Sequence, residues 1–539
     1  MAQQSVHIFV KLLFGILLQV AASQSSTIND THFIAGVVEF RPDVTGLTTA
    51  QLIANHTDAY IQILQSAEAL DTDIVVFPES SLNNEFKPTY VPAPEDRIIP
   101  CLLTSETSKY EYFLIKLSCA ARMNRKYVVI NLTEQENCTA NAAFDPRPCA
   151  ANALNIYNTN VVFDRRGSVI SRYRKVNIYV ERRNTTFEPE FAIFDTDFGV
   201  RFGHFICFDL NFYTPTEELV VKYGIRNIIF TSMWKSELPF LTAHQLQQSW
   251  AWGNNVTVIS AGGSRPESGA TGSGIYVGDN GALTAAIIGG MGVRQLFVAK
   301  VPKFDQGIAV PSPIKRQFAN LTSTPQTGIS LLRDPKLDNF KSQLLQLNSS
   351  SPISMQQCYE KICCTISIET TPSQRIYGNN SGAAPGAYQY RFGVFRALRS
   401  YEKEQYSDVA ICGIYACTNM SVASCGLLHP ANTAVAPGFA FKHLNIMGNF
   451  EKATRLLLMP NSLDLNFYSL QPEQVEWKVI DAGKSHSVSI DLKAPADNLL
   501  TFGIYANYYD GSGSSNVIGS LMLWLTCLSL WPGICIVRV

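Results

Sequence analysis

A glutamate, a lysine and a cysteine each stand at the end of an apolar, strand-like run of this chain. Glu79 ends the run VVFPE, Lys175 ends the run YRK, and Cys207 ends the run FGHFIC. Where several strands of a layered α/β protein end together, their last side chains converge on one crevice. The sequence therefore predicts that Glu79, Lys175 and Cys207 form one catalytic site.

Together these three side chains could transfer the acyl group of an amide. Glu79 would take the thiol proton and return it to the leaving amine, while Cys207 would form a thioester. The Lys175 ammonium and a backbone amide, expected to be that of Phe208, would stabilise the oxyanion. Water activated by Glu79 would then release the acid. This chemistry needs no metal and no cofactor.

A helix start soon after Cys207 is expected to influence the thiol. Residues 214–217, Thr-Pro-Thr-Glu, have the pattern of a capping box with proline at the first helical position. Backbone amides and the helix dipole would then favour a thiolate at Cys207. The alternative is that Cys207 is a buried free thiol without a function.

Other catalytic groupings have weaker support. His204 is the histidine nearest to Cys207 in the sequence, but a three-residue offset along a strand points it to the opposite face, so we expect it to be structural. His244 would need a fold that the spacing does not support. Taken singly, Glu79 could be a turn residue and Lys175 a solvated strand end. Neither Gly-x-Ser-x-Gly nor His-Glu-x-x-His occurs in the chain.

Strand and helix patterns alternate up to about residue 318, which is typical of a layered α/β domain. Strand-like runs are expected at 33–40, 73–77, 160–163, 168–174, 227–231 and 256–260, and a helix at 48–70. The turn at 164–167 joins two strands, the second of which leads to Lys175. We therefore predict a catalytic domain at 24–318.

Beyond residue 319 the sequence no longer alternates strand and helix patterns. Residues 320–325 and 348–352 resemble linkers, and short β-type runs follow at 388–395, 409–416 and 488–492. We predict a β-rich, disulfide-stapled domain at 319–510 that supports the first domain.

Both ends of the chain point to secretion and anchoring. Residues 1–23 have the short apolar run and small-residue end of a cleaved signal peptide. Residues 511–539 pass from small polar residues to an apolar terminus, which is typical of a GPI-anchor signal. A transmembrane span is the alternative there. We expect the mature protein to be attached by a lipid anchor to the outer face of the plasma membrane, from which it could be shed.

Glycosylation sequons agree with an extracellular location. They predict glycans at Asn29, Asn55, Asn131, Asn184, Asn320, Asn348, Asn379 and Asn419.

The chain has 13 cysteines, of which Cys527 and Cys535 lie in the apolar tail. An odd number remains, so one is expected to be unpaired. Setting Cys207 aside leaves enough for five disulfides of undetermined connectivity, formed by Cys101, Cys119, Cys138, Cys149, Cys358, Cys363, Cys364, Cys412, Cys417 and Cys425. Zinc binding by the cluster between Cys358 and Cys425 is the alternative.

The composition of the chain bears on the kind of partner that it can bind. The hydrophobic content of 46% is ample for large cores, and the formal net charge of −1 gives no electrostatic reason to expect a nucleic-acid partner. We expect a small-molecule amide substrate.

The three runs that end in Glu79, Lys175 and Cys207 resemble, in chain order, the signature segments of the nitrilase (carbon-nitrogen hydrolase) superfamily. That resemblance implies a Glu-Lys-Cys triad on a four-layer αββα sandwich. Residues 194–199 and 231–234, with the cysteine series of the second domain, are similar to the vanin/biotinidase branch, whose members are secreted and commonly GPI-anchored. The chain departs from that branch at 262–266, where Gly-Gly-Ser-Arg-Pro replaces a histidine loop.

The resemblance implies a pantetheinase-like amidohydrolase that converts pantetheine into pantothenate and cysteamine. If the protein is an enzyme, the alternative is a hydrolase that cleaves biocytin or another N-acyl amide. If it is not an enzyme, the alternative is a catalytically silent cell-surface module. Trp234 and Tyr213 are expected to line the substrate pocket. The accessory second glutamate of the superfamily could be Glu181, Glu188 or Glu190.

Overall fold

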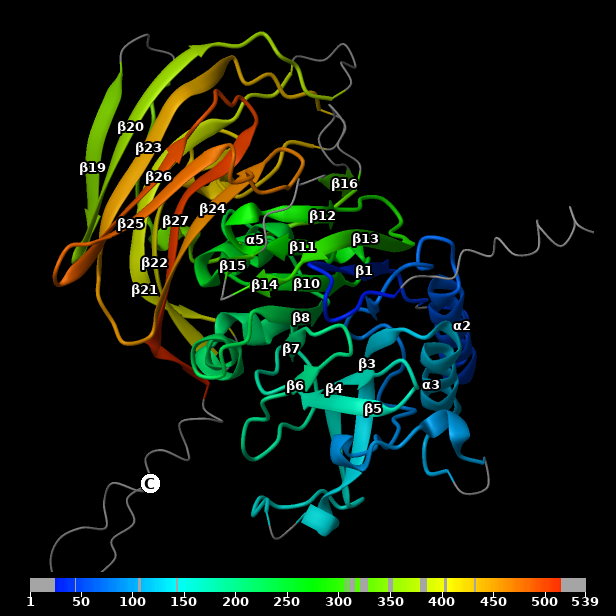
Figure 1. Cartoon of the computed structure of the whole chain (residues 1–539). Helices are drawn as coiled ribbons and strands as arrows, with labels where there is room; N and C mark the ends of the chain where they lie inside the picture. The colour runs from blue at the N-terminus through cyan, green and yellow to red at the C-terminus, as the bar shows by residue number, and fades with distance from the viewer. Residues whose placement is uncertain are drawn as a thin grey trace, which may run out of the picture.

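A computed structural model describes residues 25–43, 45–104, 108–141, 144–305, 308–309, 316–319, 328–347, 352–378, 385–401, 405–430 and 433–514. Figure 1 shows an α/β unit, coloured blue to green, beside a β unit coloured yellow to red. The predicted signal peptide and most of the predicted anchor signal lie outside the described residues. No helix in the described ranges is both long and apolar enough to cross a bilayer.

The first sheet carries the strands that precede Glu79 and Lys175. Its strand order is β13-β1-β2-β3-β4-β5, with β1, β2 and β3 parallel. β4 and β5 form the predicted hairpin, whose Gly167 has a φ of +78° and would place a Cβ 2.4 Å from the Ser118 carbonyl oxygen. The turn thus requires glycine. The strands are β1 (His32–Phe40), β2 (Ile74–Val76), β3 (Tyr127–Asn137), β4 (Leu154–Phe163), β5 (Val169–Arg174) and β13 (Arg294–Pro302).

The second sheet carries the strand that precedes Cys207. Its order is β16-β12-β11-β10-β8-β7-β6, with β7, β8 and β10 parallel and almost wholly buried. Parallel strands covered on both faces are expected to be largely apolar, as the centres of these strands are, with polar residues such as Asn227 and Ser232 at the ends of β8. The strands are β6 (Ile193–Asp195), β7 (Arg201–Ile206), β8 (Asn227–Ser232), β10 (Thr257–Gly262), β11 (Ser273–Val277), β12 (Ala282–Ala286) and β16 (Gln317–Ala319).

Helices cover the outer faces of these two sheets. α2 (Thr49–Leu64) and α3 (Tyr112–Asn124) share a core with the first sheet, whereas α5 (Ala243–Asn254) packs on the second. Between the sheets lies a separate apolar core that includes Phe33 and Phe202. The predicted four-layer αββα arrangement is therefore confirmed (Figure 1).

Two predicted helix limits are wrong. The helix expected over 48–70 ends at Leu64, and the hydroxyl of Ser66 accepts a hydrogen bond from the Ala69 amide (3.3 Å), a local turn that competes with helix. The helix expected at Thr214 begins later, as α4 (Glu218–Val221), after a π-type turn. The Thr214 hydroxyl donates to the Glu218 carboxylate (2.5 Å) instead of capping backbone amides.

In its described residues, the second domain consists of two five-stranded sheets. One has the order β18-β21-β22-β27-β24 and the other β19-β20-β23-β26-β25. The strand-like runs expected at 409–416 and 488–492 lie within β22 and β26, and the run at 388–395 begins one residue before β21, so the β-rich prediction is confirmed. The strands are β18 (Lys341–Leu344), β19 (Ile353–Tyr359), β20 (Ile362–Pro372), β21 (Gln389–Ser400), β22 (Gln405–Cys417), β23 (Phe439–Glu451), β24 (Leu456–Asp464), β25 (Val475–Asp481), β26 (Ser485–Leu492) and β27 (Leu499–Ser514). β27 thus continues into the predicted anchor segment, which was expected to start at residue 511.

The two domains pack closely through α5 and β24. A Cβ on Gly253 of α5 would lie 2.8 Å from the Leu458 carbonyl oxygen of β24, so glycine allows this approach. Gln245 of α5 also donates to the Asn461 side chain (2.7 Å). One continuous apolar cluster runs from the second sheet through α5 into the β domain. Two short pairs complete the described strands: β9 (Glu237–Leu238) with β17 (Leu332–Arg333), and β14 (Phe304–Asp305) with β15 (Ile308–Ala309).

Cysteine pairing agrees with the sequence prediction. Cys207 is the free cysteine of the described chain and is buried. Since the cysteines between 358 and 425 are disulfide-bonded, they offer no thiolates to zinc, and that alternative is wrong. The disulfides are Cys101–Cys119, Cys138–Cys149, Cys358–Cys363, Cys364–Cys412 and Cys417–Cys425.

The predicted glycosylation sites fall into three groups. Asn29, Asn55, Asn184 and Asn419 are exposed, which leaves them accessible to glycosylation. Asn320, Asn348 and Asn379 lie outside the described residues. Asn131 is buried within β3, so its prediction is wrong.

Candidate active site

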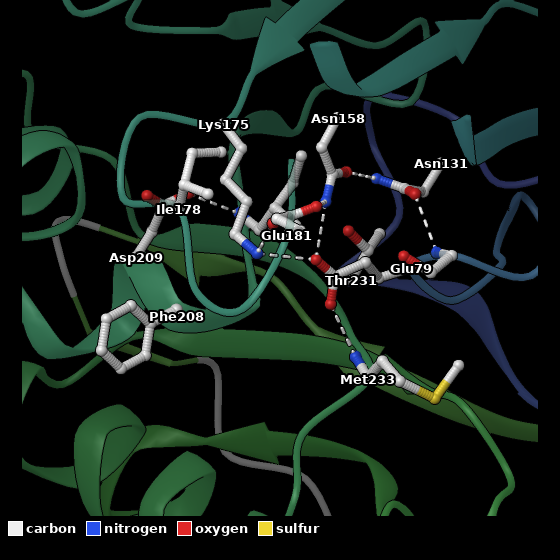
Figure 2. A network of polar contacts seen from close by, with 12 residues as sticks. Glu79, Asn131, Asn158, Lys175, Ile178, Glu181, Phe208, Asp209, Thr231 and Met233 are labelled. Carbon is white, nitrogen blue, oxygen red and sulfur yellow. Dashed lines mark hydrogen bonds and ion pairs between the residues drawn. The ribbon is translucent and has the colours of Figure 1, made fainter. Parts of the chain in front are cut away.

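Glu79, Lys175 and Cys207 meet between the two sheets, each just beyond a strand end. Glu79 follows β2, Lys175 follows β5 and Cys207 follows β7. The Lys175 Nζ lies 2.8 Å from Glu79 Oε1 (Figure 2). All three residues are less than one-tenth exposed and line one cavity of about 230 Å³. The structure thus brings together the three residues that the sequence singled out.

Three donors fix the Glu79 carboxylate. Its Oε1 accepts hydrogen bonds from Lys175 Nζ (2.8 Å) and Asn158 Nδ2 (2.8 Å), and its Oε2 accepts one from the Met233 amide (2.8 Å), as Figure 2 shows. Burial acts to raise the pKa of Glu79, but the Lys175 charge and hydrogen bonds from Lys175, Cys207 and Asn158 hold it below its usual value. The carboxylate is therefore ionised and oriented at neutral pH.

Lys175 is held between two carboxylates. Besides Glu79, its ammonium contacts Glu181 Oε1 at 2.6 Å. Burial acts to lower the pKa of Lys175, but the two carboxylates raise it well above its ordinary value. A permanent positive charge beside the thiol suits a group that stabilises a developing oxyanion.

The position of the accessory glutamate, which the sequence left open among three residues, follows from these contacts. Glu181 touches Lys175 and accepts a hydrogen bond from Asn158 Nδ2 (2.9 Å). Glu190 instead accepts the Arg174 amide (3.1 Å), and Glu188 is exposed. Glu181 is therefore the second glutamate at the site.

Cys207 is held in a strained turn. It opens the 3-10 turn Cys207–Asn211 with a φ of +48°, a conformation that costs energy in a residue with a Cβ. Asp209 fixes this turn by accepting hydrogen bonds from the Ile206 amide (3.0 Å) and the Tyr173 hydroxyl (2.8 Å). Its other oxygen accepts the Asn177 amide (2.9 Å), which ties the thiol turn to the segment after Lys175.

The expected thiolate at Cys207 is wrong for the resting site. Burial and the Glu79 charge raise the pKa of the thiol well above its usual value, although Lys175 and the Met233 amide oppose them. The helix expected to supply a dipole here, α4, has four residues and starts at Glu218. A raised pKa favours the protonated thiol, so the reaction needs Glu79 to accept this proton as the sulfur attacks.

Sequence reasoning missed a set of asparagines behind the carboxylates. Asn158 Oδ1 accepts from Asn131 Nδ2 (2.7 Å), and Asn131 Oδ1 accepts the amide of Ser80, the residue after Glu79 (2.9 Å). Asn131 Nδ2 also donates to Asn160 Oδ1 (3.1 Å). Because its amide nitrogen is engaged in this buried network, Asn131 cannot carry a glycan in the folded protein.

The two expected pocket aromatics lie in different places. Trp234 lines the cavity, and its indole N–H donates to the Leu241 carbonyl (2.9 Å). Tyr213 does not line it: the ring packs on Tyr509 at 5.8 Å and lies under the Arg455 guanidinium. Tyr213 follows the turn that Cys207 opens, and this turn carries it away from the site.

The glycine-rich loop at 262–266 lies behind the site. A Cβ on Gly263 would come within 2.2 Å of the Met233 sulfur, so glycine makes room for Met233, whose amide binds Glu79. The loop is not part of the cavity lining.

Both histidines considered above lie outside the cavity lining. His204 is hydrogen-bonded to the Ser171 hydroxyl (2.8 Å) inside the sandwich, and burial lowers its pKa to about 3. His244 packs between the rings of Tyr276 and Tyr468, and burial likewise lowers its pKa to about 3. Both are structural residues, as expected for His204.

The second domain, which we predict to support the first, also contributes side chains to the active-site cavity. Arg399 at the end of β21 and the adjoining Tyr401 line the same cavity as Cys207. The Tyr401 ring packs edge-on against Phe208, next to the nucleophile, with ring centroids 5.0 Å apart. No local signal marks these residues, since only the packing of the two domains brings them to the site.

The arrangement fits amide cleavage in two steps. As the Cys207 sulfur attacks the carbonyl carbon, its proton passes to Glu79, and Lys175 offsets the charge on the oxygen. Glu79 then protonates the leaving nitrogen, the carbon–nitrogen bond breaks, and a thioester remains on Cys207. Glu79 next takes a proton from water as the water oxygen attacks the thioester carbon. The carbon–sulfur bond then breaks, the acid leaves, and Glu79 returns the proton to the sulfur.

Comparison with known proteins agrees with this geometry. A model of the carbon-nitrogen hydrolases matches residues 29–264, and a model of the vanin C-terminal domain matches residues 329–512. Vanin-like protein 2 of Drosophila melanogaster is 40% identical over 512 residues, which cover 93% of this chain and 93% of that protein. Biotinidase of Takifugu rubripes is 30% identical over 74% of this chain and 81% of its own length. Pantetheinase of Sus scrofa is 27% identical, covering 95% and 94% respectively.

Proposed function

The chain belongs to the vanin/biotinidase branch of the nitrilase (carbon-nitrogen hydrolase) superfamily, and we propose that within it the protein cleaves pantetheine to pantothenate and cysteamine. The observation that carries the proposal is the meeting of the free thiol of Cys207, the Glu79 carboxylate and the Lys175 ammonium in one cavity, with Lys175 Nζ 2.8 Å from Glu79 Oε1. A small leaving amine such as cysteamine needs little room beyond the sulfur. Relatives named pantetheinase support this substrate.

Biocytin is the second candidate, because relatives named biotinidase match the chain with similar identity. Its bicyclic acyl group needs a wider pocket with donors for the ureido oxygen. An unsatisfied buried polar group would cost about 1 to 3 kcal/mol.

The test compares both substrates on the purified protein under one condition. We expect a higher kcat/KM for pantetheine, with the released acids, pantothenate and biotin, separated from their substrates by chromatography and quantified. Cys207→Ser, folded but inactive, is the control for non-enzymatic release. A clear preference for biocytin would reverse the assignment, and inactivity on both would leave only the reaction class.

The proposed location is the outer face of the plasma membrane, with a GPI anchor. The small residues before an apolar tail at 511–539 support it. Phosphatidylinositol-specific phospholipase should release the protein from cells that express the full chain. Protein that stays on the membrane with its C-terminal epitope retained would favour the transmembrane alternative.

A further inference from the structure

One wall of the active-site cavity is built by an ion-paired group from both domains. Arg399 of β21 contacts Asp334 through one terminal nitrogen and Glu237 of β9 through the other. The side chains of Arg399 and Asp334 are 6% and 4% exposed, whereas that of Glu237 is 17% exposed. Glu237 and Arg399 line the cavity together with Cys207.

The charges in this group do not balance. One guanidinium faces two carboxylates, and Asp334, the more buried of the two, already neutralises it. Glu237 engages Arg399 through Oε1 alone, and the described part of the chain offers its Oε2 no hydrogen-bond donor. Glu237 lines the cavity, and a carboxylate oxygen there without a protein donor is an acceptor available to a ligand.

A second polar atom in the same wall is also unsatisfied. Arg399 Nε is buried, and no acceptor for its N–H lies within the described ranges. Burying such a donor without a partner is unfavourable. Because this nitrogen is buried and does not reach the cavity, the group that the wall offers to a ligand is the Glu237 carboxylate.

The wall lies within reach of the nucleophile. Glu237 is four residues beyond Met233, whose amide binds Glu79, so their Cα atoms are at most about 14 Å apart. The aromatic rings of Phe208 and Tyr401 line the same cavity, and the Arg399 guanidinium lies 5.2 Å from the Tyr401 ring centroid. An acyl chain bound to Cys207 could run along these rings to the wall.

We propose that Glu237 and Arg399 form a subsite that binds a neutral hydroxyl or secondary-amide group in the acyl half of the substrate, with Glu237 Oε2 accepting its hydrogen. The subsite rests on the proposed amide hydrolysis and narrows its substrate class. Acyl groups that carry a carboxylate at this position are disfavoured, because they would meet Glu237 with like charge. The second domain thus takes part in substrate selection.

The test uses two amides of the same fluorogenic aromatic amine. One has a pantothenoyl group, which carries hydroxyls and an internal amide, and the other a plain hexanoyl group. Glu237→Ala should lower kcat/KM for the pantothenoyl amide about 10- to 100-fold and that for the hexanoyl amide by no more than about twofold. Glu237→Gln, which keeps one oxygen acceptor in the same shape, should lose less than Glu237→Ala.

The control is Asp338→Asn, which removes an exposed carboxylate from an ion pair with Arg333 outside the cavity and should leave both rates unchanged. Thermal unfolding of each variant checks the fold. An equal loss on both amides, or none on either, would overturn the subsite while amide hydrolysis stands. If the unaltered protein cleaves neither amide and neither pantetheine nor biocytin, the proposed function fails and the subsite with it.

Discussion

Replacing Asn158 by alanine should damage catalysis without touching any member of the triad. Asn158 Nδ2 donates to both Glu79 Oε1 (2.8 Å) and Glu181 Oε2 (2.9 Å), and its own oxygen is fixed by Asn131. A hydrogen bond to a charged group contributes about 1.5 to 3 kcal/mol. At 1.36 kcal/mol per pKa unit, its loss should raise the pKa of Glu79 by about one to two units.

Two changes in the kinetics follow. The acid limb of kcat/KM against pH should move up by about the same one to two units, because Glu79 acts as a base only when it is ionised. The maximal rate should fall about tenfold or more, since the carboxylate loses one of its orienting donors. The profile is measured with a fluorogenic amide from pH 4 to 9.

The matched control is Asn155→Ala on the same strand, whose amide contacts the Tyr157 hydroxyl (3.0 Å) away from the triad. It should leave the profile unchanged. An Asn158→Ala protein with normal thermal unfolding, an unmoved acid limb and a full maximal rate would refute the positioning role of Asn158.

Cys207→Ala should fold normally and abolish hydrolysis; near-normal turnover would exclude the thioester route. Glu79→Gln should slow hydrolysis at least about a hundredfold, yet speed alkylation of Cys207 by iodoacetamide at pH 8, because loss of the carboxylate charge lowers the thiol pKa; slower alkylation than in the unaltered protein would contradict this charge effect. Burial raises the pKa of Glu39 to about 7, so the folded state binds the extra proton between its ordinary pKa and 7 and loses stability as pH rises through that window. Glu39→Gln should therefore gain about 2 to 3 kcal/mol relative to the unaltered protein between pH 5 and 8, measured by urea unfolding; a constant difference would contradict it.

Local patterns were sufficient for the elements and for the triad. Glu79, Lys175 and Cys207 could be found because each follows a short apolar run, and a strand's end is a property of nearby residues. The same holds for the hairpin turn at Gly167 and for the choice of Cys207 as the unpaired thiol. Local patterns were less reliable at helix limits, since the Thr214 hydroxyl binds Glu218 instead of capping the backbone.

Local sequence patterns could not predict side chains whose contacts come from other strands or from the other sheet. The asparagine Asn131 lies in a perfect glycosylation sequon, yet its amide is buried against Asn158 and Asn160 from the next strand. The protonation state of Cys207 was predicted from a helix dipole, but burial and the Glu79 charge outweigh it. Both outcomes depend on neighbours that are distant in sequence.

The sequence by itself thus determined the fold class, the disulfide-stapled second domain and the three reactive residues, because periodicity, strand ends and cysteine number are local or additive properties. Only the tertiary structure decided which glutamate accompanies Lys175, which aromatic lines the cavity, and that Arg399 reaches it from the second domain. Those choices depend on the packing of two sheets and two domains, in which the contacting residues are separated by up to hundreds of positions in the chain. Desolvation and charge in the enclosed cavity then set the proton positions from which the chemistry starts.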